Sequence, residues 1–429
     1  MPKLLSATAQ AHVFPEGQKI TGFSLEYDCE LASVELAPTV FEIIDRSLEP
    51  NLPAAEMTVL GARAEGRRVV LETNPAQQAA WAIMNYTHDG SPNPMGPPLS
   101  RPKPAPGGPP KAPGGPDPKK MGYTGPKPLY IEMIQRLELK ALDGQSIPPC
   151  KTACTQLSCP EAARFELRQY KNLPYQLFIP EHYQANQSYP LVLFIPDASA
   201  RCTDPSIPLR QGIGGVVWAS RSDQSKHPCF VVCPAFGPEE LLTQDDFTCL
   251  PRLYEVKELL DDLATRYSID PERIYTTGQS MGCMASCELM CAYPDYFAGG
   301  LLVAGQWDPE RCGTAMARQN LWIMVSENDL KAHPGMDAVT AAIEKNGGTV
   351  ARLWWDASRP EELDRLAWEA LNTPANVYYT VFRGDSVVPS GEDPNPGSNH
   401  TCAWRTAYQI PAVRDWLLTR RKNGGGRHE

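Results

Sequence analysis

The stretch YTTGQSMGCMASCELM, residues 275–290, contains the pentapeptide Gly278-Gln279-Ser280-Met281-Gly282. The run before it reads as a buried strand, and the residues after it are good helix formers. A G-x-S-x-G between a strand and a helix is typical of a strained turn that projects the serine hydroxyl at the helix N-terminus. The stretch therefore predicts an α/β fold with Ser280 as a nucleophile. The alternative is a structural turn that happens to contain a serine.

Short apolar runs of the kind buried in a parallel sheet lie on both sides of this stretch. They alternate with helical patterns, of which residues 253–270 are the clearest, because five apolar side chains there fall on one face. Alternating strands and helices imply a mostly parallel sheet flanked by helices. The predicted strands are residues 189–196, 228–236, 273–278, 299–305, 321–329 and 376–384.

The first part of the chain has a different pattern. Short alternating runs between residues 21 and 71 read as β-strands, with a hairpin turn at Ala64-Glu65-Gly66. Residues 91–128 are more than half proline and glycine, so we expect them to be extended and to build no packed core. We predict an insert within one domain, because residues 129–147 again read as β-strands.

The chain therefore divides into two predicted domains. Residues 1–160 are expected to form a small all-β sandwich with the Pro/Gly-rich insert, residues 161–421 an α/β domain, and residues 422–429 a disordered tail. A chain of 429 residues with 42% hydrophobic residues is long and apolar enough for two cores.

Charge and cysteine content bear on partners and compartment. A formal net charge of −10 leaves no basic surplus for nucleic acid. No stretch reaches the roughly 18 apolar residues of a membrane span, and the start of the chain has no signal-peptide core. Thirteen cysteines, an odd number in a long chain, fit reduced thiols. We expect a cytoplasmic protein without membrane partners, or a secreted one if a leader has been removed.

A serine becomes an effective nucleophile only when a base accepts its proton and an acid orients that base. On an elbow of this kind, the acid and then the base follow the serine along the chain. Three histidines follow Ser280. His400 lies in a loop before a terminal amphipathic helix, His333 lies just after a strand, and His428 lies in the polar tail. His400 is therefore the predicted base.

The acid is expected at the carboxyl end of a strand, where α/β sheets assemble their sites. Residues 321–329 form an apolar run that ends in Glu327-Asn328-Asp329. Asp329 is the predicted acid, with Glu327 and Asp308 as competitors. The alternative for Asp329 is a solvated carboxylate in a turn.

Residues 164–420 resemble an α/β-hydrolase of the esterase group that includes polyhydroxybutyrate-depolymerase-like and predicted-peptidase, prolyl-oligopeptidase-like sequences. The matching segments are LPYQLFIPEHY, YPLVLFIP, YSIDPERIYTTGQSMG, FAGGLLVAGQWDP and the closing His400 with AWRTAYQIPAVRDWLL. The β-rich N-terminal region resembles the immunoglobulin-like domain that precedes the hydrolase domain in some such esterases. The resemblance implies an α/β-hydrolase fold preceded by an immunoglobulin-like sandwich.

One segment departs from the pattern of these enzymes. They usually carry a His-Gly-x-Gly-like turn after the strand that matches residues 191–195, whereas this chain has Pro196-Asp197-Ala198-Ser199. A backbone donor does not depend on its side chain, so the N–H groups of Ala198 and Met281 are the predicted oxyanion hole. Gln279 and Trp307 are the predicted substrate-binding residues.

The sequence thus predicts a serine hydrolase that cleaves a carboxylic ester through an acyl-enzyme, with Ser280, Asp329 and His400 as the triad. This chemistry requires no cofactor or metal. The alternatives are a prolyl-oligopeptidase-like serine peptidase and a non-enzymatic binding protein with a vestigial hydrolase domain. The expected partner is a small-molecule ester, and the N-terminal domain is the predicted surface for any oligomer.

Overall fold

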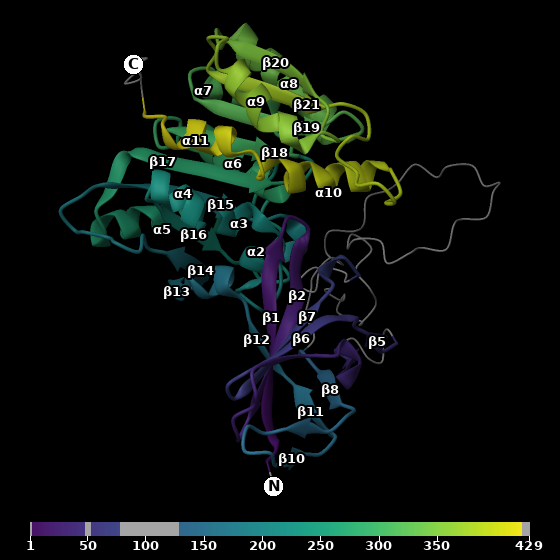
Figure 1. Cartoon of the computed structure of the whole chain (residues 1–429). Coiled ribbons are helices and arrows are strands. Elements are labelled where there is room, and N and C mark those ends of the chain that lie inside the picture. The colour runs from purple at the N-terminus through teal and green to yellow at the C-terminus, as the bar shows by residue number, and fades with distance from the viewer. Residues whose placement is uncertain (1, 48–52, 78–127, 423–429) are drawn as a thin grey trace. The chain divides into compact units, whose positions relative to one another are not determined.

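The structure is a computed structural model that describes residues 2–47, 53–77 and 128–422 (Figure 1). Two compact units divide after Ala163, and the sequence predicted a boundary at residue 160. The predicted insert, except Pro128, and the predicted tail, except Lys422, lie outside the described residues. Each unit has its own sheets and its own buried side chains.

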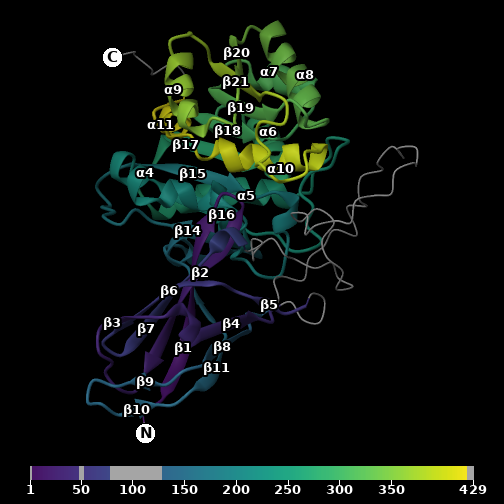
Figure 2. The same cartoon turned by 45° about the vertical axis from the view of Figure 1, so that its right-hand side comes forward.

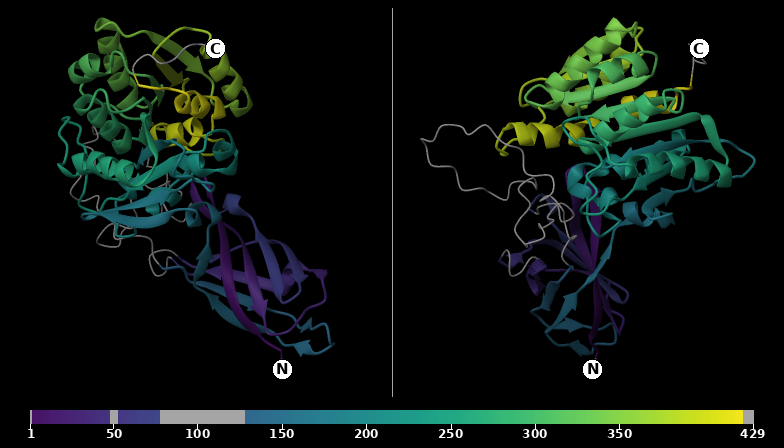
Figure 3. Two further views of the ribbon diagram at one scale, coloured as in Figure 1. Left: turned by 90° about the vertical axis from the view of Figure 1, so that its left-hand side faces the viewer. Right: turned by 180° about the vertical axis from the view of Figure 1, so that it is seen from behind.

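Unit 1 consists mostly of β-strands (Figure 3). They are β1 (Leu4–Phe14), β2 (Gly17–Tyr27), β3 (Val34–Leu36), β4 (Phe41–Asp45), β5 (Ala55–Glu56), β6 (Val59–Glu65), β7 (Arg68–Thr73), β8 (Ile131–Gln135), β9 (Leu139–Lys140), β10 (Ser146–Ile147), β11 (Cys150–Cys154) and β12 (Gln156–Ser158). One sheet has the order β12-β1-β2-β7-β6-β3 and another the order β11-β8-β4-β5. The buried Tyr27 hydroxyl donates to Gln135 Oε1 at 3.0 Å, so these two sheets face each other.

The sequence signals of unit 1 correspond to particular turns and pairings. The turn predicted at Ala64-Glu65-Gly66 joins β6 to β7, and Gly66 has a φ of +58°, a region that favours glycine. β8, which follows the predicted insert, pairs with β4, which precedes it. The chain therefore returns to the same sheet. The sheets are antiparallel except for the parallel pair β1–β12, and their immunoglobulin-like character stays a prediction.

Unit 2 contains a nine-stranded sheet. Its strands are β13 (Glu166–Tyr170), β14 (Leu173–Phe178), β15 (Tyr189–Ile195), β16 (Phe230–Pro234), β17 (Ile269–Gln279), β18 (Gly299–Val303), β19 (Leu321–Ser326), β20 (Val350–Trp355) and β21 (Val377–Phe382). Their order is β13-β14-β16-β15-β17-β18-β19-β21-β20. The pairs β13–β14 and β14–β16 are antiparallel, and every later neighbouring pair is parallel. This confirms the predicted α/β class.

Helices cover both faces of this sheet. They are α2 (Ile207–Arg210), α3 (Ile213–Val216), α4 (Arg221–Lys226), α5 (Arg252–Arg266), α6 (Met281–Ala292), α7 (Pro309–Met316), α8 (Ala332–Lys345), α9 (Pro360–Ala370), α10 (Pro396–Ala407) and α11 (Pro411–Leu418). Helices α5 to α8 pack in succession on one face, and α3, α9, α10 and α11 pack on the other. Figure 2 shows α9 and α11 on one side of the strands β18–β21, with α7 and α8 on the opposite side.

Helices on both faces of the sheet explain the apolar runs in the sequence. All seven residues of β15 are buried, because helices shield both faces of the central strands. The six predicted strands are present, and the predicted helix at 253–270 is α5. β13, β14 and β20 were not predicted. β20 lies at the edge of the sheet, where buried and exposed residues mix and Trp354 is 45% exposed.

Candidate active site

Ser280 lies at the turn predicted from the G-x-S-x-G pentapeptide. β17 ends at Gln279 and α6 begins at Met281, so the chain reverses its path at Ser280 itself. The backbone of Ser280 has a φ of 52° and a ψ of −118°, a combination that non-glycine residues rarely adopt. This strained turn places the serine at the carboxyl edge of the sheet and at the N-terminus of α6.

Close packing at the elbow requires both glycines of the pentapeptide. A Cβ on Gly282 would lie 1.9 Å from the carbonyl oxygen of Ile195, and a Cβ on Gly278 would lie 2.4 Å from the carbonyl carbon of Gly282. These neighbours are backbone atoms, which cannot rotate away as the end of a side chain can. Glycine at both positions therefore lets the first turn of α6 approach the end of β15.

Side chains from three distant segments meet at this elbow. His400, on α10, has its Nε2 2.9 Å from Ser280 Oγ and its Nδ1 2.5 Å from Asp329 Oδ2. Asp329 is 3% exposed, and its Oδ1 accepts hydrogen bonds from the N–H groups of Lys331 and Ala332 at 3.1 and 3.0 Å. A carboxylate beside Nδ1 holds the proton on that nitrogen and leaves Nε2 free to accept one from a hydroxyl.

Burial and charge oppose each other at the acid and the base. Burial raises the pKa of Asp329, but the charge of His400 and the hydrogen bonds to Asp329 outweigh it, so this pKa is lowered from its ordinary value. Burial and, to a smaller extent, Lys331 lower the pKa of His400. Asp329, with a smaller contribution from Asp197, outweighs these two effects, so the pKa of His400 is raised. The site therefore favours an ionised Asp329 beside a basic imidazole.

The competing candidates have other partners. Glu327 accepts a hydrogen bond from the N–H of Gly384 at 2.6 Å, and Asp308 caps the N-terminus of α7. His333 Nδ1 lies 3.0 Å from the carbonyl oxygen of Glu327. His428 lies outside the described residues. These contacts give the described competitors local structural roles.

The start of α10, which carries His400, is fixed by a polar network that the sequence did not reveal. Asn395 caps the helix by accepting hydrogen bonds from the N–H groups of Gly397 and Ser398. Asn399, directly before His400, is fully buried. Its Oδ1 accepts from Ser326 Oγ at 2.6 Å, which ties α10 to the end of β19. The sequence shows an Asn beside the predicted base, but the role of this Asn could not be predicted because its partner, Ser326, is 73 residues away.

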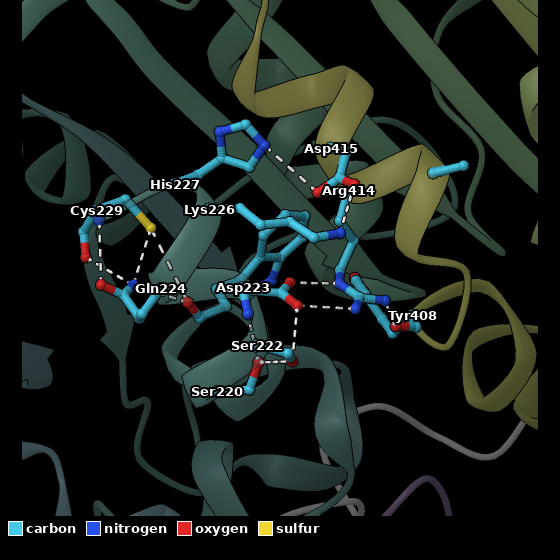
Figure 4. Close-up of polar contacts among 12 residues, drawn as sticks. Ser220, Ser222, Asp223, Gln224, Lys226, His227, Cys229, Tyr408, Arg414 and Asp415 are labelled. Carbon is cyan, nitrogen blue, oxygen red and sulfur yellow. Dashed lines mark hydrogen bonds and ion pairs between the residues drawn. The ribbon is translucent and has the colours of Figure 1, made fainter.

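The end of α10 is anchored by a buried ion pair (Figure 4). Arg414 Nε and Nη2 donate to the two carboxylate oxygens of Asp223 at 2.6 and 3.0 Å, and both side chains are buried. Arg414 Nη1 also donates to the carbonyl oxygen of Tyr408 at 2.6 Å. The hydroxyl of Tyr408 in turn lies 3.1 Å from Thr277 Oγ1 on β17. The chain that follows His400 is thereby tied to α4 and to the strand that carries the elbow.

The two predicted oxyanion donors occupy equivalent positions after neighbouring strands. Ile195 of β15 pairs with Gly278 of β17, and Ala198 and Met281 each follow three positions later. Met281 is the first residue of α6, so its N–H has no acceptor within the helix. Ala198 begins a 3₁₀ turn, Ala198–Ala200. Both donors thus lie at the carboxyl edge of the sheet, as Ser280 does.

The structure gives Gln279 and Trp307 roles that differ from the predicted substrate binding. Gln279 is 1% exposed, and its Nε2 donates to Asp197 Oδ2 at 2.8 Å. Trp307 is fully buried, and its Nε1 donates to Glu288 Oε2 at 3.0 Å. Both polar groups are engaged inside the protein. The sequence did not reveal that these two side chains turn inward.

The fold and the elbow together define a class of protein. A mostly parallel sheet flanked by helices, with a strained serine between a central strand and the next helix, is the α/β-hydrolase fold. A solved structure described as a thermostable esterase matches this chain with a TM-score of 0.75 and 21% sequence identity. The match covers 97% of this chain and 100% of the esterase chain. At that identity the likeness shows the fold.

A particular relative is similar in sequence. The chain is 28% identical over 173 residues to poly(3-hydroxyalkanoate) depolymerase C from Paucimonas lemoignei. The match covers 38% of this chain and 38% of that protein, so the chain spans well under half of the relative that it matches. No family model matches the chain.

Two further observations concern ligands and membranes. Within residues 2–47, 53–77 and 128–422, no group of three or more His, Cys, Asp or Glu side chains is arranged to hold a metal ion. No helix in the described part of the chain has the length and apolar character that crossing a bilayer requires.

Proposed function

We propose that this protein is a serine hydrolase that cleaves carboxylic esters through an acyl-enzyme. The proposal rests on the hydrogen-bonded chain from Ser280 through His400 to Asp329 at a strained elbow. The similarity to a poly(3-hydroxyalkanoate) depolymerase supports an ester as the substrate. The expected partner is a small-molecule ester.

The geometry supports a two-stage reaction. Ser280 Oγ attacks the ester carbonyl while His400 Nε2 accepts its proton, and Asp329 stabilises the imidazolium that forms. The Ala198 and Met281 N–H groups are the proposed donors to the oxyanion, where one donor is worth about 10²–10³ in rate. His400 then gives the proton to the leaving alcohol. In the second stage water attacks the acyl carbonyl while His400 accepts its proton. The bond to Ser280 Oγ then breaks, His400 returns the proton to Ser280 Oγ, and the acid is released.

A serine peptidase is the second candidate, because the same residues can cleave an amide. The two functions differ in the leaving group, so the ratio of turnover between an ester and the matching anilide separates them. We also propose a cytoplasmic location, which the 13 free thiols support, with secretion as the alternative if a leader has been removed.

The test compares the wild type with Ser280→Ala on p-nitrophenyl butyrate and a fluorophosphonate probe. We expect wild-type turnover and labelling, and a fall of about 10⁶ in kcat for the variant. His400→Ala is expected to reduce kcat to a similar extent. His333→Ala is the matched control, because the His333 ring contacts the Glu327 carbonyl oxygen, and it is expected to keep its turnover. Persistent labelling of Ser280→Ala would disprove the assignment of the nucleophile. Equal loss in both histidine variants would point to a general structural effect.

A further inference from the structure

A buried carboxylate and a buried amide join the two segments that hold the predicted oxyanion donors. Asp197 is 5% exposed, Gln279 is 1% exposed, and Gln279 Nε2 donates to Asp197 Oδ2 at 2.8 Å. Asp197 directly precedes Ala198. Gln279 ends β17, two positions before Met281. The reaction described above uses neither side chain.

The other polar atoms of Asp197 shape the turn that contains Ala198. Its Oδ1 accepts from the N–H of Ser199 at 2.7 Å, and its carbonyl oxygen accepts from the N–H of Ala200 at 3.2 Å. In a trans peptide the C=O and the next N–H point in opposite directions. Because the Asp197 carbonyl faces the turn, the Ala198 N–H is directed away from it.

A buried guanidinium holds the next peptide unit. Arg201 is 1% exposed, its Nε donates to the carbonyl oxygen of Ala198 at 3.0 Å, and its Nη1 donates to the carbonyl oxygen of Pro238 at 2.8 Å. The peptide units on both sides of Ala198 are therefore tied down by hydrogen bonds. Donors held rigidly before the reaction are what an oxyanion hole needs, because they then require no reorganisation as charge develops.

We propose that Asp197 and Gln279 form a positioning pair that keeps the Ala198 N–H aligned with the Met281 N–H for the oxyanion. This inference rests on the proposed function. The side-chain bridge lies in the segment after β15 in which the sequence departs from the His-Gly-x-Gly-like turn of the enzymes that it resembles.

Two variants test the positioning pair. Gln279→Met keeps the shape but removes the donor, and leaves the buried Asp197 carboxylate without this partner. We expect a fall of about 10² in kcat for p-nitrophenyl butyrate with little change in KM, because a misplaced donor is felt mainly in the transition state. Asp197→Asn keeps an acceptor for the Ser199 N–H, so kcat is expected to fall less than in Gln279→Met.

Gln319→Met is the matched control, since Gln319 is also buried and its Nε2 donates to three carbonyl oxygens away from the elbow. It is expected to lose stability without the fall in kcat. Wild-type kcat in Gln279→Met, with Ser280→Ala inactive, would overturn the positioning pair and leave the proposed function intact.

Absence of ester turnover in the wild type would overturn the proposed function, on which the positioning pair rests.

Discussion

Asp329 acts on His400 through both position and charge. Its Oδ2 orients the imidazole by the contact with Nδ1, and its Oδ1 is itself held by two backbone N–H groups. These backbone bonds fix the carboxylate at the end of β19, so its direction does not depend on the imidazole. A single side chain thereby sets which nitrogen of His400 faces Ser280 and how strongly that nitrogen attracts a proton.

Replacement of this carboxylate is predicted to change the pH profile in a defined direction. His400 must be neutral to accept the serine proton, so activity is lost as the pH falls through its pKa. Asp329 raises that pKa, hence Asp329→Asn is expected to move the acid limb of kcat/KM to lower pH and to reduce kcat by about 10⁴. Steady-state rates from acidic to neutral pH provide the measurement.

The control for this prediction is Asp308→Asn, because Asp308 caps α7 and, among the described side chains, makes no hydrogen bond to His400 or Ser280. Its pH profile is expected to match that of the wild type. An acid limb that stays in place in Asp329→Asn would mean that this carboxylate does not set the pKa of the base.

At the scale of elements, the contact between α6 and β15 decides whether the elbow can form. The first turn of α6 approaches the end of β15 so closely that a Cβ on Gly282 would lie 1.9 Å from the Ile195 carbonyl oxygen. The helix and the strand are both buried in the core, so neither can shift without disturbing other contacts. The small side chain is therefore a requirement of packing as well as of the turn.

Gly282→Ala is accordingly predicted to destabilise the protein by about 1–3 kcal/mol or more, the usual cost of overpacking. Urea unfolding followed by tryptophan fluorescence measures the change. Gly237→Ala is the matched control, since its Cβ would meet only the Glu240 carboxylate at an ordinary 3.5 Å. Equal stability of the two variants would show that α6 can move away from β15 at little cost.

At the scale of the whole molecule, contacts distant in sequence hold the site of unit 2 together. The ion pair of Asp223 with Arg414 joins residues 191 positions apart (Figure 4). It fixes α11 against α4 and, through Tyr408, the end of the helix that carries His400. In Figure 1, α10 and α11 follow one another in yellow across the same face of the sheet. The position of His400 thus depends on the folding of the last segment of the chain.

Arg414→Met is predicted to cost about 3–5 kcal/mol in the free energy of unfolding, because it leaves Asp223 buried without its counter-charge. Ester turnover is expected to fall with the fraction folded. The control is Arg365→Met, which breaks an exposed pair with Glu369 one helical turn away and is expected to cost only about 0.3–0.5 kcal/mol. A loss in Arg414→Met no larger than in the control would show that the buried pair does not stabilise unit 2.

Local patterns in the sequence were sufficient for the fold class of unit 2 and for the elbow. Strand and helix periodicity depends on residues a few positions apart, so the central strands and α5 could be predicted without knowledge of the fold. The elbow was predictable because its strained turn and close packing demand glycine at fixed spacing. β20 was missed because an edge strand is covered unevenly and shows no clear period.

Only the tertiary structure decided which way side chains turn and what they meet. Gln279 is next to Ser280 in the chain, yet it lies on a strand that is covered on both faces and turns inward to Asp197, 82 positions away. Asp329 and His400 likewise come together across 71 positions. Such contacts form because the sheet brings the carboxyl ends of β15, β17 and β19 to one edge. That order depends on the packing of the whole sheet, which no local pattern encodes.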